Sequence, residues 1–231
     1  MKTRQEIKAN AKEAMKQQWG TSIGAPILLG VVIGVASFIA TMFMFRAPIF
    51  GALLSFAVSF FLAIPLSIGL YKVFVKIYRK ESTSAGEIFQ GFSVNYWRKI
   101  GGLVWMMLFY WLWSLLFIIP GIIKLFAYSM IPYILADCPN VTAREAMKLS
   151  MRMTKGYKGQ IFVMYLSFIG WFLLGTLTLH ILTIIFVGPY MSTTVAGYYN
   201  ELKKNAIESG TISAAEFGEE SSTVFEEVFT N

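Results

Sequence analysis

Charged side chains are scarce in this chain, and long stretches of it contain none. Asp, Glu, Lys and Arg make up 14% of the 231 residues, whereas soluble domains carry roughly 25%. Residues 21–45 hold no charged side chain, and hydrophobic residues account for 56% of the chain. This composition excludes an ordinary soluble domain and indicates an integral membrane protein.

The residue types that usually carry out catalysis are almost missing. The chain has one cysteine, Cys138, and one histidine, His180. A single cysteine excludes an intramolecular disulfide and a thiolate metal cluster, and a single histidine cannot supply the three or four ligands of a zinc site. The sequence contains no phosphate-binding P-loop and no paired carboxylates near an apolar segment. We therefore expect no catalytic residues, no metal site, no cofactor and no enzymatic activity.

Long apolar segments alternate with short turns and with basic loops along the chain. A helix needs roughly 20 predominantly apolar residues to cross a bilayer. The pattern predicts an all-α polytopic membrane protein with about six transmembrane helices in three hairpins, connected over residues 21–200. The predicted spans are 21–45, 49–71, 101–119, 122–136, 161–179 and 181–198.

The central hairpin, whose turn is predicted at Pro120-Gly121, allows two interpretations. Its second arm, residues 122–136, is short for a helix that crosses a bilayer. A re-entrant loop over residues 118–137 is the alternative to a full crossing. Charge does not distinguish the two, because both keep the same loops on the same side of the membrane.

Three segments have amphipathic helical patterns that suit a membrane surface, at residues 1–20, 84–91 and 142–155. In the first and third, basic residues recur at about every fourth position opposite an apolar face, which indicates a helix in the headgroup layer. The alternative for residues 1–20 is a solvated helix. We expect membrane lipids with anionic headgroups to contact these basic residues: Lys8, Lys12, Lys16, Arg144, Lys148, Arg152 and Lys155.

Basic residues and the acidic tail set the expected orientation. With six crossings, 18 of the 20 Lys and Arg residues lie on one side, and basic loops are typically cytoplasmic. Both termini are therefore expected in the cytoplasm. Residues 201–231 are acidic and polar, which predicts a mostly disordered tail, with residues 224–229 as a candidate docking helix for a protein partner. No nucleic-acid partner is expected, and the sequence does not define the oligomeric state.

One predicted span is interrupted by a proline. Pro132 has no N–H, so the carbonyl of Tyr128 loses its helical partner and needs another donor inside a bilayer. Transporters use such broken helices to bind substrates, although a proline kink can also serve helix packing. The only charged side chain inside a predicted span is Lys124, which either snorkels to the surface or faces a site. The candidate membrane-embedded site consists of Lys124, Tyr128, Ser129, Pro132 and Tyr133.

Several short motifs in the second half of the chain resemble those of a bacterial membrane family. They are Ile119-Pro-Gly-Ile-Ile-Lys124, Tyr128-Ser-Met-x-Pro-Tyr-Ile-Leu-Ala-Asp137, Glu145-Ala-Met-Lys-Leu-Ser150, Gly156-Tyr-Lys158 and Leu166-Ser-Phe-Ile-Gly-Trp171. Together they resemble the integral membrane family catalogued as domain of unknown function 975, over nearly all of residues 1–200. The turn at 46–48 is shorter than the family leads us to expect, and the acidic tail lies outside it.

The resemblance implies a multi-pass protein of the bacterial plasma membrane and supplies no activity or catalytic residues. The leading hypothesis is a non-catalytic protein of envelope or lipid homeostasis that contacts anionic lipids. The alternative is a small-molecule transporter or exporter whose site lies at the proline-broken helices. A membrane enzyme that uses Ser129 or His180 is a third hypothesis.

Overall fold

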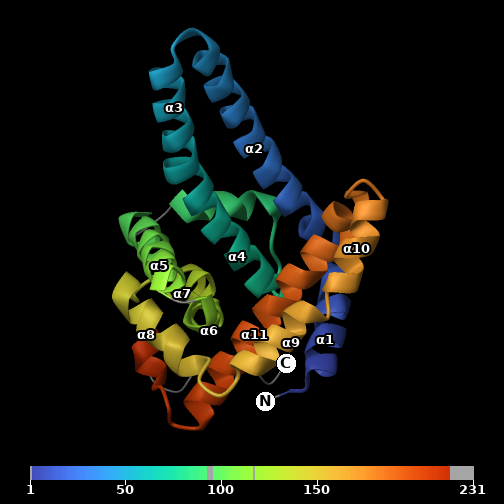
Figure 1. Cartoon of the computed structure of the whole chain (residues 1–231). Helices are drawn as coiled ribbons and strands as arrows, with labels where there is room; N and C mark the ends of the chain where they lie inside the picture. Colours follow the sequence, from blue (N-terminus) through green and yellow to red (C-terminus); the bar gives the residue numbers. More distant parts are fainter. Residues whose placement is uncertain (1, 93–95, 117, 219–231) are drawn as a thin grey trace.

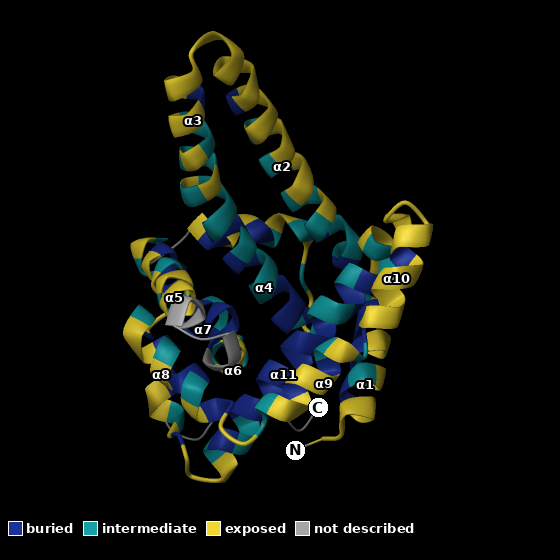
Figure 2. Cartoon of the chain, viewed as in Figure 1, coloured by how far each residue is buried: buried dark blue, intermediate teal, exposed yellow. Residues whose placement is uncertain are grey.

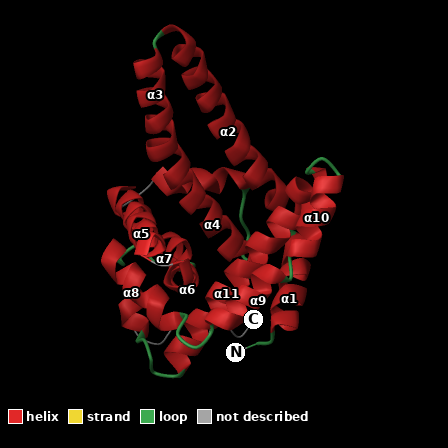
Figure 3. Cartoon of the chain, in the orientation of Figure 1, coloured by secondary structure: helices red, strands yellow, loops and turns green. Residues whose placement is uncertain are grey.

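The computed structural model describes residues 2–92, 96–116 and 118–218 and, except at 113–120, their side chains. All regular structure in these residues is helical (Figure 3), which confirms the all-α prediction. The α-helices are α1 Arg4–Gln17, α2 Trp19–Arg46, α3 Pro48–Ala57, α4 Ile64–Tyr78, α5 Tyr96–Leu116, α6 Ile118–Tyr128, α7 Ile131–Asp137, α8 Ala143–Met153, α9 Lys158–Leu166, α10 Ile169–Leu177 and α11 Gly188–Glu208. Two π-helical segments, η1 Val58–Ala63 and η3 Thr183–Val187, and two 3-10 segments, η2 Ala85–Phe92 and η4 Ala214–Phe217, complete the fold.

Three helical stretches in the described part of the chain are long and apolar enough to cross a membrane. They are Trp19–Arg46, Pro48–Tyr78 and Lys158–Leu177. These stretches coincide with the predicted spans 21–45, 49–71 and 161–179. The other three predicted spans, and with them the six-span arrangement, stay a prediction.

The hairpin of α2 and α3 extends away from the rest of the molecule (Figure 1). Its turn lies at Ala47, inside the predicted turn 46–48. Close to the turn the two helices touch so tightly that a Cβ atom at Gly51 would clash with the backbone of Met44. Most side chains toward the tip are exposed (Figure 2), Phe45 by 88%. An apolar surface of this extent suits a hydrocarbon environment rather than water.

The buried core lies where α4, α7 and α11 meet. α11 contributes more buried residues than α4 or α7, 14 of its 21. It begins at Gly188, and Pro189 occupies its first turn, where a missing N–H costs no helical hydrogen bond. The second half of the predicted span 181–198 is therefore a helix surrounded by other parts of the protein.

α1 packs its apolar side against α11 and α4. Ile7, Ala11 and Met15 are fully buried there. Gly197 of α11 allows the close approach, because a Cβ atom at that position would overlap Tyr78 and Ile7. The amphipathic pattern predicted for residues 1–20 is present, but neighbouring helices cover its apolar face.

η2 lies across α4 in a contact that depends on two glycines. A Cβ atom at Gly69 would overlap the carbonyl oxygen of Ile88, and one at Gly91 would overlap the carbonyl oxygen of Pro65. The segment predicted as an interfacial helix at 84–91 is thus a 3-10 helix seated directly on the backbone of α4.

The central hairpin differs from its prediction in two places. α6 begins at Ile118, so Pro120-Gly121 lies within its first turn and does not form the connection from α5. α6 then ends at Tyr128 and α7 begins at Ile131. The span predicted over 122–136, with its interruption at Pro132, is thus built from two short helices, and whether it crosses a membrane stays a prediction.

Described structure continues beyond residue 200, where we placed the start of the tail. α11 runs to Glu208, and η4 follows with its Phe217 side chain buried. The carboxylate of Glu216 pairs with Arg152 of α8 at 2.5 Å. Residues 209–218 therefore fold back onto the body of the molecule. The candidate docking helix at 224–229 lies outside the described residues.

Candidate functional site

The break between α6 and α7 is built from local backbone chemistry. Pro132 is in the first turn of α7, where its missing N–H costs nothing and its fixed φ angle favours helix initiation. Ser129 ends the preceding turn, and its Oγ donates to the carbonyl of Phe126 at 2.8 Å. The proline identified in the sequence thus starts a new helix instead of bending one.

A cavity of about 720 Å³ lies beside this break. Its walls come from α4, α5, α6, α7, α9, α10 and α11. Most lining side chains are apolar, and hydroxyl groups supply the polar ones. The hydroxyl-bearing residues of the wall are Tyr71, Tyr110, Tyr128, Ser129, Tyr133, Tyr165 and Ser192.

Tyr133 fixes one side of the cavity. Its ring meets Tyr71 of α4 edge-on with centroids 4.8 Å apart, and it stacks on Tyr199 of α11 at 5.8 Å. Such aromatic pairs favour defined ring orientations. Tyr133 is almost fully buried, so α4, α7 and α11 hold this part of the wall together.

The rim of the cavity is apolar and exposed. Met107 of α5, Leu125 of α6 and Leu166 of α9 line the cavity while about half of each side chain remains exposed. Phe162 of α9 and Ile169 of α10 also line the cavity and are about half exposed. A molecule that enters through this rim therefore passes apolar side chains first.

Four of the five predicted membrane-embedded site residues contribute to the cavity: Tyr128, Ser129, Pro132 and Tyr133. The fifth residue, Lys124, lies outside the wall. Its Nζ is 3.9 Å from the Sδ of Met151 on α8 and 5.7 Å from the Tyr128 ring centroid. The structure therefore brings the uncharged members of the predicted set together and directs the charged one toward α8.

An ionic cluster joins the C-terminal ends of α4 and α7 to the second half of α11. Arg79 donates from both terminal guanidinium nitrogens to the Asp137 carboxylate, at 2.8 Å each. Lys203 donates to the same carboxylate at 2.9 Å, and the Tyr199 hydroxyl donates at 2.8 Å. Arg79 also donates from Nε to the side-chain oxygen of Asn200 at 2.8 Å. The two hydrogen bonds from Arg79 to Asp137 form a bidentate pair, a strong form of arginine–carboxylate pairing.

The cluster is largely buried, and its two cations favour the ionised form of the Asp137 carboxylate. The side chain of Asp137 is 11% exposed and that of Lys203 is 4% exposed. Burial alone would raise the pKa of Asp137, but the charges and hydrogen bonds of Arg79 and Lys203 outweigh it and hold that pKa well below its usual range. A carboxylate with so low a pKa is a poor general base, so its geometry suits a structural tie between helices.

The basic stripe of α1 divides into two environments. Lys12 and Lys16 are exposed. Lys8 instead donates to the Oγ of Ser167 at 3.0 Å, and its Nζ lies 4.1 Å from the Phe168 ring centroid. Desolvation by burial, with a smaller contribution from the charge of Arg4, lowers the pKa of Lys8. Lys8 is thus engaged with α9 and its following turn, whereas the other two lysines remain accessible.

The basic stripe of α8 is exposed. Arg144, Lys148, Arg152 and Lys155 all lie on the surface, and the capping box of Thr142 and Glu145 begins the helix. Arg152 is bound to Glu216 and to the carbonyl of Thr211. Lys148, Arg152 and Lys155 border a hollow of about 370 Å³. Contact of this surface with lipid headgroups stays a prediction.

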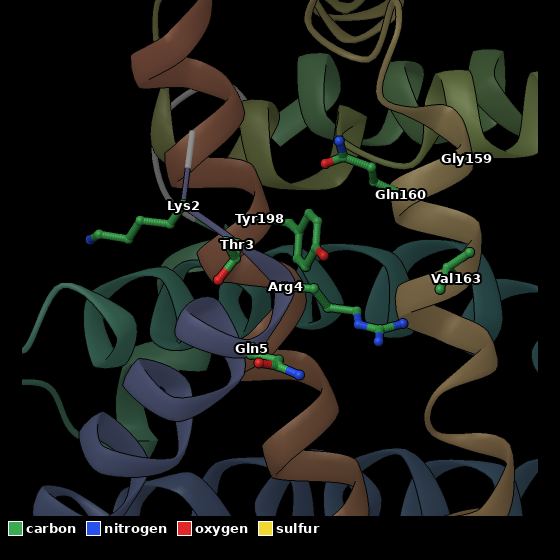
Figure 4. A pocket seen from close by; sticks show the side chains of 8 residues that line it. All are labelled: Lys2, Thr3, Arg4, Gln5, Gly159, Gln160, Val163 and Tyr198. Carbon is green, nitrogen blue, oxygen red and sulfur yellow. The ribbon is translucent and has the colours of Figure 1, made fainter.

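A further hollow of about 580 Å³ separates the start of α1 from α9. The side chains of Arg4, Gln160 and Tyr198 lie around it (Figure 4). Among the described residues, no group of three or more His, Cys, Asp or Glu side chains is placed to hold a metal ion.

Comparison with known families decides what the chain is related to. A family model described as "Protein of unknown function (DUF975)" matches residues 1–127 and 116–206. The chain belongs to this family. The assignment confirms the resemblance drawn from the sequence motifs. No curated protein and no solved structure matches the chain.

The DUF975 match includes both the cavity and the ionic cluster, and it stops before η4. Sequence reasoning missed the partners of Asp137, because Arg79 and Lys203 lie 58 and 66 residues away from it. A usable signal was present: each of the three residues lies at or beyond the end of a largely apolar stretch. Charged groups at equivalent depths of different helices are candidates for mutual pairing.

Proposed function

We propose that this DUF975 protein is a non-catalytic integral membrane protein that binds the apolar portion of a membrane amphiphile in the cavity beside Ser129 and Pro132. The observation that carries the proposal is the cavity itself, about 720 Å³ in volume and bordered by four predicted site residues. Pockets for small molecules typically measure about 300–1,000 Å³. A role in envelope or lipid homeostasis is consistent with such a ligand.

The wall chemistry restricts the ligand. The lining residues that the structure describes include no Asp, Glu, Lys, Arg or His, and their polar groups are tyrosine and serine hydroxyls. Burying an unpaired charge against such a wall costs several kcal/mol. Hydroxyls can instead exchange hydrogen bonds with an uncharged ester, carbonyl or hydroxyl group. The cavity therefore suits acyl chains or a similar apolar body with an uncharged polar group.

The apolar rim favours lateral binding from the membrane over uptake from water. Exposed Met107, Leu125 and Leu166 border the opening, and in a bilayer such side chains face hydrocarbon. The transporter hypothesis requires a polar route from the cavity to water. The rim supports a binding role for a molecule that is already dissolved in the membrane.

The test is photo-labelling of the purified full-length chain with a diazirine-bearing diacylglycerol. Ser192 lines the cavity from α11, so the Ser192→Phe substitution adds volume inside it. We expect labelling to fall about tenfold, which corresponds to a loss of ~1.4 kcal/mol in binding. Labelled peptides of the native chain should come from α7, α9 and α11.

Ser59→Phe is the matched control, because Ser59 lies on η1 and its side chain is exposed. This variant should be labelled as strongly as the native chain. Equal labelling of the two variants, or native labelling confined to the exposed α2–α3 hairpin, would contradict the proposal. Thermal unfolding in detergent shows whether each variant has folded.

Surface contact with anionic lipids is a second candidate role. Its support is the exposure of Lys12, Lys16, Arg144, Lys148 and Lys155, each charge being worth ~1 kcal/mol near an anionic membrane. A Lys148→Gln variant should bind phosphatidylglycerol vesicles more weakly than the native chain, and its binding should decrease less steeply as the salt concentration rises. Binding indistinguishable from that of the native chain would remove this role.

A further inference from the structure

A further pocket, here named the basic pocket, lies beside α4 and is lined there by Ile68, Gly69 and Lys72. It has a volume of about 290 Å³ and is enclosed by α4, η2, the start of α5 and the end of α7. Three cationic side chains line it: Lys72 of α4 and the consecutive pair Arg98 and Lys99 of α5. None of them belongs to the basic stripes of α1 and α8.

The three cations have neutral acceptors. Lys72 donates to the side-chain oxygen of Gln90 at 3.0 Å. Lys99 donates to the carbonyls of Gln90 and Gly91 at 3.1 and 3.2 Å. Arg98 donates to the carbonyls of three residues at the end of α7 and in the loop that follows, which are Leu135, Cys138 and Val141.

Among the described residues, no nearby carboxylate remains to neutralise this charge. Asp137 is the one acidic residue among the described residues that line the pocket, and it is already held by Arg79 and Lys203. Glu87 of η2 is paired with Lys76 at 2.8 Å. The described surroundings of the basic pocket therefore keep an excess of positive charge.

Two further observations indicate that burying these positive charges is energetically costly. The Nε atom of Arg98 is buried and has no hydrogen-bond partner in the described chain, and an unsatisfied buried donor is costly. Lys99 is 7% exposed. Burial and then the like charges of Arg98 and Lys72 lower its pKa. An anion with several acceptor oxygens in the pocket would offset the repulsion among these like charges.

Exposed aromatic side chains flank the basic pocket in the sequence. Phe89 and Phe92 of η2 stand on either side of the lining pair Gln90 and Gly91, and both are substantially exposed. Trp97, which precedes Arg98, is 70% exposed. Aromatic side chains of this kind anchor proteins at the boundary between headgroups and hydrocarbon.

We propose that the basic pocket of Lys72, Arg98 and Lys99 binds a phosphate group, with the exposed aromatics holding the pocket at the membrane surface. A phosphate presents several strong acceptors to lysine and arginine donors. A phospholipid headgroup and a soluble phosphate both carry this chemistry. The site is separate from the Ser129 cavity, so the Ser192→Phe substitution should leave it unchanged.

The first arm of the test is native mass spectrometry of the delipidated full-length chain with phosphatidylglycerol and with phosphatidylcholine of the same chains. The native protein should prefer phosphatidylglycerol, and Lys72→Gln should weaken that binding about fivefold. Lys99→Met, which keeps the aliphatic stem, is the second variant. Size-exclusion profiles show whether each variant has folded.

The second arm measures the unfolding temperature in inorganic phosphate against chloride at equal ionic strength. Stabilisation of the native chain that Lys72→Gln abolishes, without any lipid preference, assigns the pocket to a soluble phosphate compound. Lys80→Gln is the control, because Lys80 is exposed and pairs with Glu13. The proposal fails if neither phosphate source discriminates the variants, or if Lys80→Gln weakens binding as much as Lys72→Gln.

Discussion

The α2–α3 hairpin and the junction of α4, α7 and α11 distribute their side chains in opposite ways. The hairpin exposes apolar residues such as Phe38 and Phe45 along its length and buries few. The junction encloses Asp137 and Lys203 and satisfies them with hydrogen bonds. In the proposed membrane setting, the first region relies on the surrounding hydrocarbon as its solvent, whereas the second supplies its own polar environment.

The difference shows where the stability of each region comes from. An exposed apolar side chain in hydrocarbon has little to lose when it is shortened, because lipid fills the space. A buried charge has no such substitute, since removing one partner leaves the others desolvated and unpaired. Substitutions of equal size should therefore have very different effects in the two regions.

The largest effect is expected from Asp137→Ala, which leaves Arg79 and Lys203 buried without their common carboxylate. Breaking such a cluster typically costs ~3–5 kcal/mol of folding stability. Cys138 offers a direct measurement, because it is the only cysteine and is buried next to Asp137. We expect a thiol-reactive fluorophore to label Cys138 much faster in the variant, and labelling at the native rate would contradict a stabilising cluster.

A double-mutant cycle separates this pairing from local packing. Arg79→Ala should also speed labelling of Cys138, and the double variant should be less affected than the sum of the two single changes. Strict additivity would mean that the two side chains act independently, against the bidentate geometry at 2.8 Å.

An intermediate effect is expected from Gly69→Ala, because a Cβ atom there would overlap the carbonyl oxygen of Ile88. η2 must move off α4 to accommodate it, and overpacking of this kind typically costs ~1–3 kcal/mol. Thermal unfolding in detergent measures the loss. Gly30→Ala is the control, since a Cβ atom at Gly30 meets nothing within 4 Å. Equal unfolding temperatures for the two variants would show that η2 is not seated on this glycine.

The smallest effect is expected from Leu53→Ala on the hairpin. Leu53 is 63% exposed, and surface changes of this kind usually alter stability by less than about 0.5 kcal/mol. Its unfolding temperature and the labelling rate of Cys138 should both match the native values. A clear loss of stability would show that a second protein surface, and not hydrocarbon, covers this face.

The sequence predicted much of the helical architecture because apolar run length and charge are local properties. The turn at 46–48, the helix start at Thr142 and the three long apolar helices follow from neighbouring residues alone. The break at Ser129–Met130 was recognised only as a kink, because a proline predicts an interruption but not whether a helix bends or restarts. The burial of the apolar face of α1 depends on Gly197, 190 residues beyond Ile7, and no local pattern contains it.

The candidate site was predictable in part for the same reason. Tyr128, Ser129, Pro132 and Tyr133 are close in sequence, so one motif contained all four. The opposite wall, with Tyr71 and Ser192, comes from helices distant in the chain. The basic pocket was not predicted, because Lys72, Arg98 and Lys99 entered the sequence argument only through the count of basic residues on one side of the membrane. The geometry instead joins Lys72 to η2 and Arg98 to α7.

The ionic cluster also has a consequence for the order in which the chain assembles during synthesis. Arg79 and Asp137 emerge first and can pair, but Lys203, Tyr199 and Asn200 arrive with α11. Until then the core between α4 and α7 lacks both its central helix and a third of its charged cluster. A nascent chain that ends before α11 is therefore an incomplete folding unit, and packing of α11 against α4 and α7 completes the ionic cluster.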